Sequence, residues 1–180
     1  MIFATVGTQL PFDRLLLGLN SWAMRNPNVP VLAQSGASKR EFSHLKSVAH
    51  LSQTEFRAQF EAARLVVAHA GMGSILTATE LGKPILLMPR RAKFNEHRND
   101  HQEDTAKEMM RLSNVTVVED GEALHEALDL ALACGFEPGL ASATRRASDL
   151  DPLIEVVRDF VWTEAKPAGP AATPFWRKLA

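Results

Sequence analysis

The chain has little cysteine and almost no net charge. Cys134 is the one cysteine among 180 residues, so it forms no internal disulfide and leaves no thiolate cluster for a metal ion. A reducing, cytoplasmic setting is therefore expected. The formal net charge of −1 argues against broad electrostatic binding of nucleic acid, and no nucleic-acid partner is expected.

Long apolar runs and several well-known motifs are also missing. No run approaches the roughly 20 apolar residues that span a bilayer, and Met1-Ile2-Phe3 opens no signal peptide, so a partner would have to bring the chain to any membrane. The dinucleotide fingerprint Gly-x-Gly-x-x-Gly is absent. The Walker pattern is absent too, because Lys83 follows Gly82 at the far end of an expected helix, where it can cap carbonyls. No internal repeat and no Ser-His-Asp order stands out.

Short apolar, β-branched runs predict six strands. They cover Ile2–Val6, Val29–Ala33, Ser47–Leu51, Leu65–Ala68, Ile85–Met88 and Val115–Val118. Apolar residues recur at helical spacing between most of them, and Asp120 and Asp151 are expected N-caps. Alternating strands and helices predict an α/β fold whose parallel sheet is covered on both faces. The length fits one domain, expected over residues 1–162.

The composition changes from Thr163 onward, where residues 163–180 are rich in proline and alanine. One interpretation is a disordered tail. The other is a docking peptide, because Phe175-Trp176 lies beside two cations and suits a partner groove or a membrane surface. Asp149 and Asp151 have the Asp-x-Asp spacing of some metal sites, but they precede Pro152 and a helix, so capping explains them better.

The most informative segment runs from Leu65 to Met88. An apolar run meets His69, Gly71 and Gly73, an amphipathic stretch follows, and a second apolar run ends the segment. This order predicts strand, glycine turn, helix and strand, with the turn at the edge where open α/β sheets bind ligands. The first N–H groups of a helix have no partner within it, and the helix dipole favours negative charge there. We therefore predict an anion site, most plausibly for phosphate, at Gly71–Ser74.

Other polar residues are expected at the same edge. Gly7 permits a close backbone approach after the first strand, and Thr8 and Gln9 supply polar side chains. His69 is either a structural histidine or a donor to a phosphate oxygen. Glu80 is either a solvated helix residue or a carboxylate that accepts ribose hydroxyls.

The segment 89–109 combines cations with amides and histidines. His97 and His101 are four residues apart, which on a helix is a possible metal geometry, but no third ligand is evident. A polar loop and helix start that donate to sugar hydroxyls and phosphate explain the same residues with fewer assumptions, so no metal is expected. Arginine side chains at 90, 91 or 98 are candidates to neutralise a phosphate.

Taken together, four motifs resemble the C-terminal, nucleotide-sugar-binding domain of glycosyltransferase family 28. They are Gly7-Thr8-Gln9, His69-Ala70-Gly71-Met72-Gly73-Ser74, Gly82-Lys83-Pro84 and Asn99-Asp100-His101-Gln102. The resemblance covers roughly residues 1 to 135 and is strongest to single-domain members, which are catalytic subunits of two-subunit UDP-sugar transferases or their counterparts in bacterial exopolysaccharide synthesis. It implies the Rossmann-like C-terminal half of a GT-B enzyme that binds UDP-sugar without a metal or other cofactor.

The resemblance also implies roles for individual residues. Gly71, Gly73 and Ser74 would hold the diphosphate, Leu51-Ser52-Gln53 would lie against uracil, and Gln102 would reach the sugar hydroxyls. Many family members have a ribose-binding glutamate where this chain has Thr77, and Glu80 is the candidate replacement one helical turn later. The expected substrate-binding residues are Gly7, Thr8, Gln9, Leu51, Ser52, His69, Gly71, Met72, Gly73, Ser74, Glu80, Arg90, His97, Asn99 and Gln102.

The chain supplies one of the two Rossmann-like domains of a GT-B enzyme. The resemblance therefore implies a membrane-anchored, acceptor-binding partner subunit that carries the general base and presents a polyprenyl-diphosphate-linked acceptor at the cytoplasmic membrane face. The leading hypothesis is the donor-binding, catalytic subunit of an inverting UDP-sugar transferase. Two rival hypotheses are a nucleotide-sugar epimerase-like enzyme and a non-catalytic nucleotide-sugar-binding regulatory module.

Overall fold

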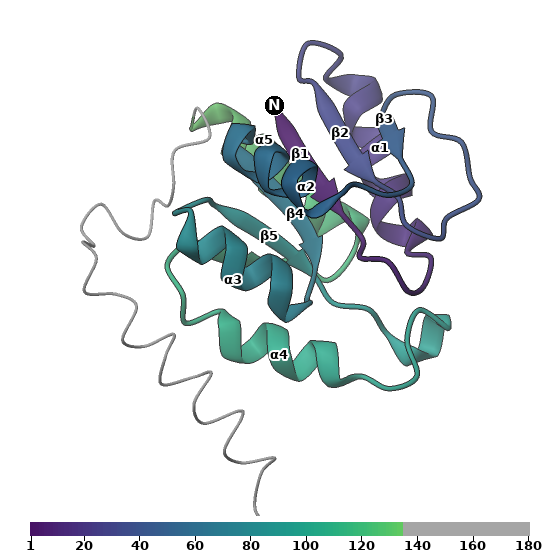
Figure 1. The fold of residues 1–180 in the computed structure, drawn as a ribbon, viewed down its shortest axis with the longest axis vertical. Helices are drawn as coiled ribbons and strands as arrows, with labels where there is room; N and C mark the ends of the chain where they lie inside the picture. Colours follow the sequence, from purple (N-terminus) through teal and green to yellow (C-terminus); the bar gives the residue numbers. More distant parts are fainter. Residues whose placement is uncertain (135–180) are drawn as a thin grey trace, which may run out of the picture. The chain divides into compact units, whose positions relative to one another are not determined.

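The computed structural model describes residues 1–134, which form a parallel sheet with helices on both faces (Figure 1). The elements are β1 (Ile2–Thr5), α1 (Asp13–Arg25), β2 (Val31–Gln34), β3 (Lys46–Val48), α2 (Gln53–Ala62), β4 (Leu65–His69), α3 (Met72–Glu80), β5 (Ile85–Met88), the 3-10 helix η1 (Ala92–Phe94), α4 (His101–Met109), β6 (Val115–Val117) and α5 (Gly121–Ala133). The predicted α/β, Rossmann-like class is confirmed. The predictions for Asp149–Asp151, for the helix after Pro152, for the boundary at residue 162 and for the tail lie outside the described residues.

The strand order places a switch point at the centre of the sheet. The six strands lie in the order β3-β2-β1-β4-β5-β6, and every neighbouring pair is parallel. The chain therefore builds outward from β1 in one direction and then from β4 in the other. The loops that leave β1 and β4 diverge at their carboxyl ends, and this is where such sheets bind ligands.

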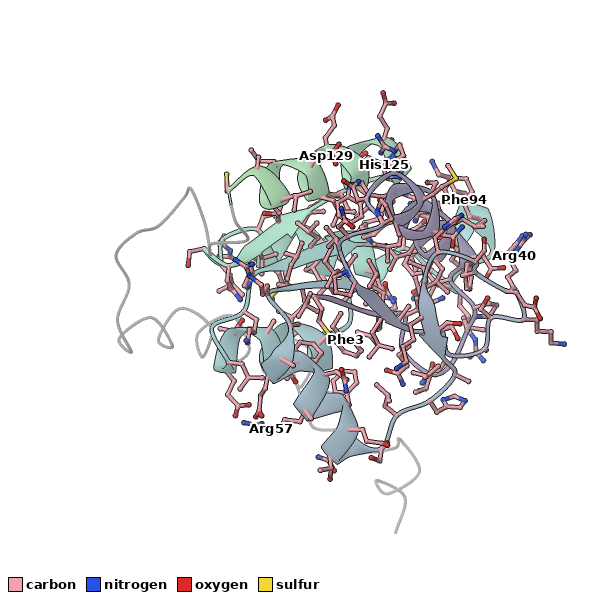
Figure 2. The ribbon with its side chains drawn as sticks, turned by 90° about the horizontal axis from the view of Figure 1, so that it is seen from above. Phe3, Arg40, Arg57, Phe94, His125 and Asp129 are labelled. Atoms are coloured by element: carbon pink, nitrogen blue, oxygen red, sulfur yellow. The ribbon has the colours of Figure 1, made fainter. Side chains whose placement is uncertain are left out.

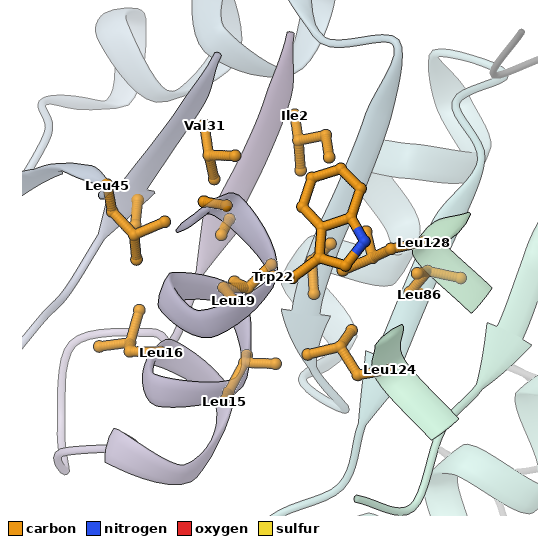
Figure 3. Close-up of a cluster of buried hydrophobic side chains, with 14 of the residues drawn as sticks. Ile2, Leu15, Leu16, Leu19, Trp22, Val31, Leu45, Leu86, Leu124 and Leu128 are labelled. Atoms are coloured by element: carbon orange, nitrogen blue, oxygen red, sulfur yellow. The ribbon is translucent and has the colours of Figure 1, made fainter. Parts of the chain in front are cut away.

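The core lies on both faces of the sheet. On one face α1 and α5 pack together, with Trp22, Leu124 and Leu128 in a buried cluster (Figure 3). On the other face the ring of Phe3 meets the rings of Phe56 and Phe60 from α2 at centroid distances of 5.6 and 5.5 Å. Figure 2 shows Phe3 on the side of the sheet opposite to His125 and Asp129 of α5. Burial on both faces explains why the central strands are continuously apolar.

All six predicted strands exist, but several of their ends differ from the prediction. β1 stops at Thr5 because Gly7 has a positive φ of 75° and turns the chain away from the ladder. β2 begins at Val31 because Pro30 has no N–H to donate to a neighbouring strand. Asp120 caps α5 as predicted, since its side chain accepts a hydrogen bond from the Ala123 N–H.

Lys83 caps a different helix from the one the sequence suggested. Its Nζ donates to the carbonyls of Glu61 and Ala63, at 2.6 and 2.9 Å, and these lie at the end of α2. The reason is that α2 and α3 pack against each other, so the long side chain reaches across to its neighbour. Within residues 1–134 no helix is long and apolar enough to cross a membrane.

Candidate functional site

Two adjoining cavities open at the carboxyl edge of the sheet. The larger cavity, of about 490 Å³, is lined by Thr5, Gly7, Thr8, Gln34, Leu51, Gln53, Phe56, Arg57, His69, Gly71, Gly73, Ser74 and Thr77. The smaller cavity, of about 240 Å³, is lined by Val6, Gly7, Thr8, Gln9, Leu10, His69, Arg90, His97 and Gln102. Because Gly7, Thr8 and His69 line both, the two cavities form one candidate site at the switch point between β1 and β4.

His69 ends β4 and sits at the junction of the two cavities. Its imidazole lies against the backbone of two glycines, since a Cβ at Gly7 would approach Cε1 of the ring to 2.9 Å and a Cβ at Gly71 would approach Nε2 to 2.3 Å. No side chain fits at either position while the ring stays where it is. The two glycines of the predicted motifs are therefore required by the histidine between them.

The environment of His69 keeps its ring neutral. Burial lowers the pKa of His69 to about 4, and the nearby positive charge of Arg90 acts in the same direction. The backbone of Thr5 opposes this shift slightly. The buried Nδ1 forms no hydrogen bond of normal geometry within the described part of the chain. A neutral ring at this position offers one N–H donor or one acceptor to a bound ligand.

The N-terminus of α3 is open to the larger cavity. Gly71 is its N-cap and carries no capping side chain. A Cβ built on Gly73 would meet nothing within 4 Å, so this residue faces open space. The N–H groups of Gly71 and Ser74 donate to the carbonyls of His69 and Gly71, at 2.8 and 3.2 Å, so the first-turn N–H groups of Met72 and Gly73 are the ones that no intrahelical carbonyl can accept. The predicted anion site thus lies at the edge of the larger cavity, and anion binding there stays a prediction.

Two buried residues that line the larger cavity, Thr5 at the end of β1 and Gln34 at the end of β2, are hydrogen-bonded to each other. The Thr5 hydroxyl donates to the Gln34 side-chain carbonyl at 3.0 Å, and both residues are buried. Leu51, Gln53 and Phe56 line the end of the cavity toward α2. Ser52 does not line it, because its hydroxyl and backbone complete a capping box with Glu55 that starts α2. Of the predicted stretch 51–53, the structure brings Leu51 and Gln53 to the cavity.

The polar residues after β5 line the smaller cavity in part. The Gln102 side-chain carbonyl accepts from the Arg90 N–H at 3.1 Å, which fixes the amide beside the cavity. His97 lines the cavity and pairs with Asn99, whose side-chain oxygen also pairs with His101. His97 precedes α4, so the helical metal geometry that its spacing suggested does not form. In residues 1–134 no group of three or more His, Cys, Asp or Glu side chains is placed to hold a metal ion.

Besides Ser52, three more of the predicted residues line neither cavity. Met72 opens α3 without lining either cavity. Glu80 ends α3, at the opposite end of that helix from Gly71, and accepts a hydrogen bond from the exposed Arg57 guanidinium at 3.0 Å. Asn99 orients the two histidines beside it. Thr77, one helical turn earlier in α3, lines the larger cavity, whereas the Glu80 carboxylate is bonded to Arg57 and does not line it.

Arg90 lines the smaller cavity, but its guanidinium turns inward. Only 3% of the residue is exposed, and its N–H groups donate to backbone carbonyls. Arg91 forms ion pairs with Glu103 and Glu119 outside the cavities. Arg98, the third candidate, lines neither cavity. That one of these three arginines directly neutralises a phosphate stays a prediction, which their placement does not favour.

Sequence reasoning missed several residues of the site. Gln34, Phe56 and Arg57 line the larger cavity, and Thr77 does so in the position where the family glutamate was expected. Gln34 stands at a strand end like Thr8, so its position was a usable signal. Phe56 and Arg57 carry no signal in a short helical segment, because only the packing of α2 brings them to the edge.

The fold and site define a Rossmann-like α/β domain with a ligand-sized site at the switch point of its sheet. Residues 1–148 match the model of the glycosyltransferase family 28 C-terminal domain. The chain belongs to this family, as its motifs suggested, and corresponds to the C-terminal half of the GT-B fold.

Individual relatives agree with this assignment. The UDP-N-acetylglucosamine transferase subunit ALG13 of Yarrowia lipolytica is 25% identical over an alignment of 141 residues that covers 69% of this chain and 67% of that protein. A solution structure of ALG13 has a TM-score of 0.56 at 17% identity and covers 84% of this chain and 93% of that one.

Larger enzymes share the fold over part of their length. The crystal structure of Acinetobacter baumannii MurG has a TM-score of 0.54 at 16% identity, and it covers 74% of this chain and 42% of that one. The glycotransferase of kitacinnamycin has a TM-score of 0.53 at 20% identity, with 73% and 34% covered. The chain thus spans less than half the length of these two proteins.

Proposed function

We propose that the chain is the donor-binding, catalytic subunit of an inverting UDP-sugar glycosyltransferase. The observation that carries this proposal is the continuous site around His69, where the open N-terminus of α3 meets two cavities. The larger cavity takes the uridine at its Leu51 and Gln53 end, Gly71–Ser74 binds the diphosphate, and the smaller cavity takes the sugar beside Gln9 and Gln102. The donor therefore lies along the carboxyl edge of the sheet, as the family resemblance implies.

The proposed chemistry requires the chain to hold the donor and stabilise the leaving group. An acceptor hydroxyl oxygen attacks the anomeric carbon, the bond from that carbon to the diphosphate breaks, and UDP leaves with the extra negative charge. The helix dipole and the backbone donors within Gly71–Ser74 stabilise that charge, and the neutral ring of His69 lies beside them without adding a like or opposite charge. We propose that no metal ion takes part, and that the base which accepts the hydroxyl proton belongs to a partner subunit.

The partner is proposed because the chain supplies one wall of a cleft. It spans 42% and 34% of the two larger enzymes, whereas it covers 93% of ALG13, a protein named as a transferase subunit. We propose that a membrane-anchored subunit binds a polyprenyl-diphosphate-linked acceptor and docks on the carboxyl edge of the sheet. The chain would then work at the cytoplasmic membrane face, in exopolysaccharide or glycan synthesis. Holding donor and acceptor together is what lowers the barrier.

Calorimetry tests the donor site directly. We expect the purified chain to bind UDP and at least one UDP-sugar with EDTA present, and adding Mg²⁺ should leave the dissociation constant unchanged. Failure to bind any uridine diphosphate would exclude the proposal. A requirement for the metal would exclude its metal-free form.

Transfer is tested by adding the acceptor and the partner. Radiolabel from a UDP-sugar should enter the lipid fraction when the chain is combined with membranes that contain the partner, and not with the chain alone. Efficient transfer by the purified chain onto a lipid-linked acceptor would overturn the two-subunit proposal. Donor binding without transfer in the complete system would favour a regulatory module, and conversion of the sugar within the donor would favour an epimerase.

A further inference from the structure

Most hydrogen bonds from the side chain of Arg90 go to the loop that follows β1. Its Nη2 donates to the carbonyls of Val6 and Leu10 at 2.6 and 2.7 Å, and its Nη1 donates to the carbonyl of Pro11 at 2.8 Å. A further bond from Nη1 reaches the Glu96 carbonyl at 3.1 Å. Three of these four carbonyls bracket the segment Val6–Pro11. That segment includes Gly7, Thr8 and Gln9, which line the smaller cavity.

The guanidinium is buried without a carboxylate bonded directly to it. Burial lowers the pKa of Arg90 to about 10, and the group remains charged at neutral pH. Its solvation comes from the four carbonyls and from the ring of Phe12, whose centroid lies 4.7 Å from Cζ. A buried cation is costly unless such partners are in place, so these hydrogen bonds stabilise the loop in the conformation that provides them.

An ion pair between Arg14 and Glu96 holds the loop after β5 on the other side of Arg90. The Glu96 carboxylate accepts from Nε and Nη2 of Arg14 at 2.8 and 2.9 Å, and from the Arg91 N–H at 3.0 Å. Glu96 is only 7% exposed, and Arg14 also donates to the Pro89 carbonyl. The loop after β5 is therefore tied to α1 on one side, while Arg90 ties it to the loop after β1 on the other.

We infer that Arg90 is a positioning residue for the sugar end of the donor site. It acts through the Val6–Pro11 loop by holding the backbone of Gly7, Thr8 and Gln9 against the smaller cavity. The inference rests on the proposed function for the identity of the ligand. Direct binding of the diphosphate is a poor alternative, because four of the five N–H groups of Arg90 are donated to carbonyls.

The experiment compares Arg90→Lys with Lys83→Met in the full chain. Lysine keeps the charge but presents its donors from a single nitrogen, so it cannot reach all four carbonyls that Nη1 and Nη2 of the guanidinium serve. Lys83 is a matched control, since it too is a cation that donates to backbone carbonyls, but at the other end of α3 from the site. The ligands are UDP and the UDP-sugar that binds most tightly to the unchanged chain.

Arg90→Lys should raise the dissociation constant of the UDP-sugar about tenfold, as expected when charge-assisted hydrogen bonds are lost, and that of UDP less than about threefold. Lys83→Met should leave the ratio of the two constants unchanged. A ratio unaltered by Arg90→Lys, or altered equally by both variants, overturns the inference. Glu96→Gln retains the Glu96 carbonyl but loosens the Arg14 ion pair, and should shift the ratio in the same direction to a smaller extent.

Amide hydrogen exchange of the ligand-free chain gives a readout that does not depend on the proposed function. Exchange at Gly7, Thr8 and Gln9 should accelerate in Arg90→Lys and stay unchanged in Lys83→Met. Unchanged exchange in Arg90→Lys overturns the positioning role even if UDP-sugar binds. Accelerated exchange in a chain that binds no uridine diphosphate supports the role of Arg90 in holding the loop and refutes only the proposed ligand.

Discussion

Helices α3 and α5 both begin at the carboxyl edge of the sheet, but only α5 has a side chain that caps its N-terminus. Helix α5 starts after Asp120, whose carboxylate accepts a hydrogen bond from the Ala123 N–H. Helix α3 starts after Gly71, which offers no side chain to its first turn. Both helices carry a glycine near the start with open space beside it, Gly121 in α5 and Gly73 in α3. The physical difference is whether the chain itself satisfies the first N–H groups.

The comparison distinguishes a structural helix start from a binding site. The α5 terminus has its own negatively charged partner, so an outside anion gains little there. The α3 terminus lacks one and lines the larger cavity, beside a histidine that is kept neutral. The cap at the N-terminus of α5 therefore stabilises the fold. At the N-terminus of α3 the corresponding hydrogen bonds would come from a bound ligand.

The largest expected effect is a loss of stability at acid pH through His69. The pKa of His69 is about 4 in the folded chain and near the usual histidine value of 6.5 in the unfolded chain, so the unfolded chain binds the proton first. Stability is therefore unaffected above about pH 6.5 and falls as the pH drops from 6.5 toward 4, by on the order of 3 kcal/mol.

Urea unfolding at pH 7, 5.5 and 4.5 measures this loss. In His69→Gln the part of the pH dependence that comes from His69 should disappear. The part that comes from carboxylates present in both chains should remain. An identical pH dependence in both chains would show that the ring is not kept neutral by the fold.

Blocking the open terminus should abolish most of the ligand affinity. Gly73→Val places a branched side chain where the diphosphate is proposed to bind, and loss of hydrogen bonds to a charged group costs about 1.5–3 kcal/mol, roughly ten- to a hundredfold in affinity for UDP. The fold tolerates the change because nothing lies within 4 Å. Calorimetry with EDTA present is the measurement. Gly121→Val is the matched control and should bind UDP with the affinity of the unchanged chain. Equal affinity for UDP in both variants would show that the diphosphate does not bind at the N-terminus of α3.

Removing the cap of α5 should affect stability alone. Asp120→Ala leaves the Ala123 N–H without its acceptor, and loss of such a cap costs about 1 kcal/mol. Chemical denaturation should show this loss as a lower midpoint, with the dissociation constant for UDP unchanged. A change in UDP affinity as large as that of Gly73→Val would mean that the two termini do not differ in function.

The smallest expected effect is at the far end of α3. Glu80 forms an exposed ion pair with Arg57, and such pairs contribute about 0–1 kcal/mol. Glu80→Ala should therefore change the affinity for UDP less than about fivefold, whereas Thr77→Val alters the wall of the larger cavity and should have the greater effect. A stronger loss for UDP than for inorganic diphosphate in Glu80→Ala would instead show that Glu80 recognises the ribose.

Much of this site could be predicted because its signals are local. The apolar runs of β4 and β5 and the glycines between them occur within one short segment, and that segment forms the strand, turn and helix that were expected. Gln9, Gln102 and His97 reach the cavity because they follow strands whose carboxyl ends meet. Glu80 was proposed by counting along a helix, and counting does not tell that its carboxylate would be bonded to Arg57 of α2.

By itself the sequence determined the α/β class, the existence of the six strands and the glycine turn at Gly71, because strand and turn preferences act over a few neighbouring residues. Only the tertiary structure decided that Arg90 turns inward to the Val6–Pro11 loop and that Arg14 pairs with Glu96. The bonding partners of these arginines lie 79 to 84 residues away in Val6–Pro11 and at Glu96. Such contacts depend on which strands are neighbours and in what register, and no local preference carries that information.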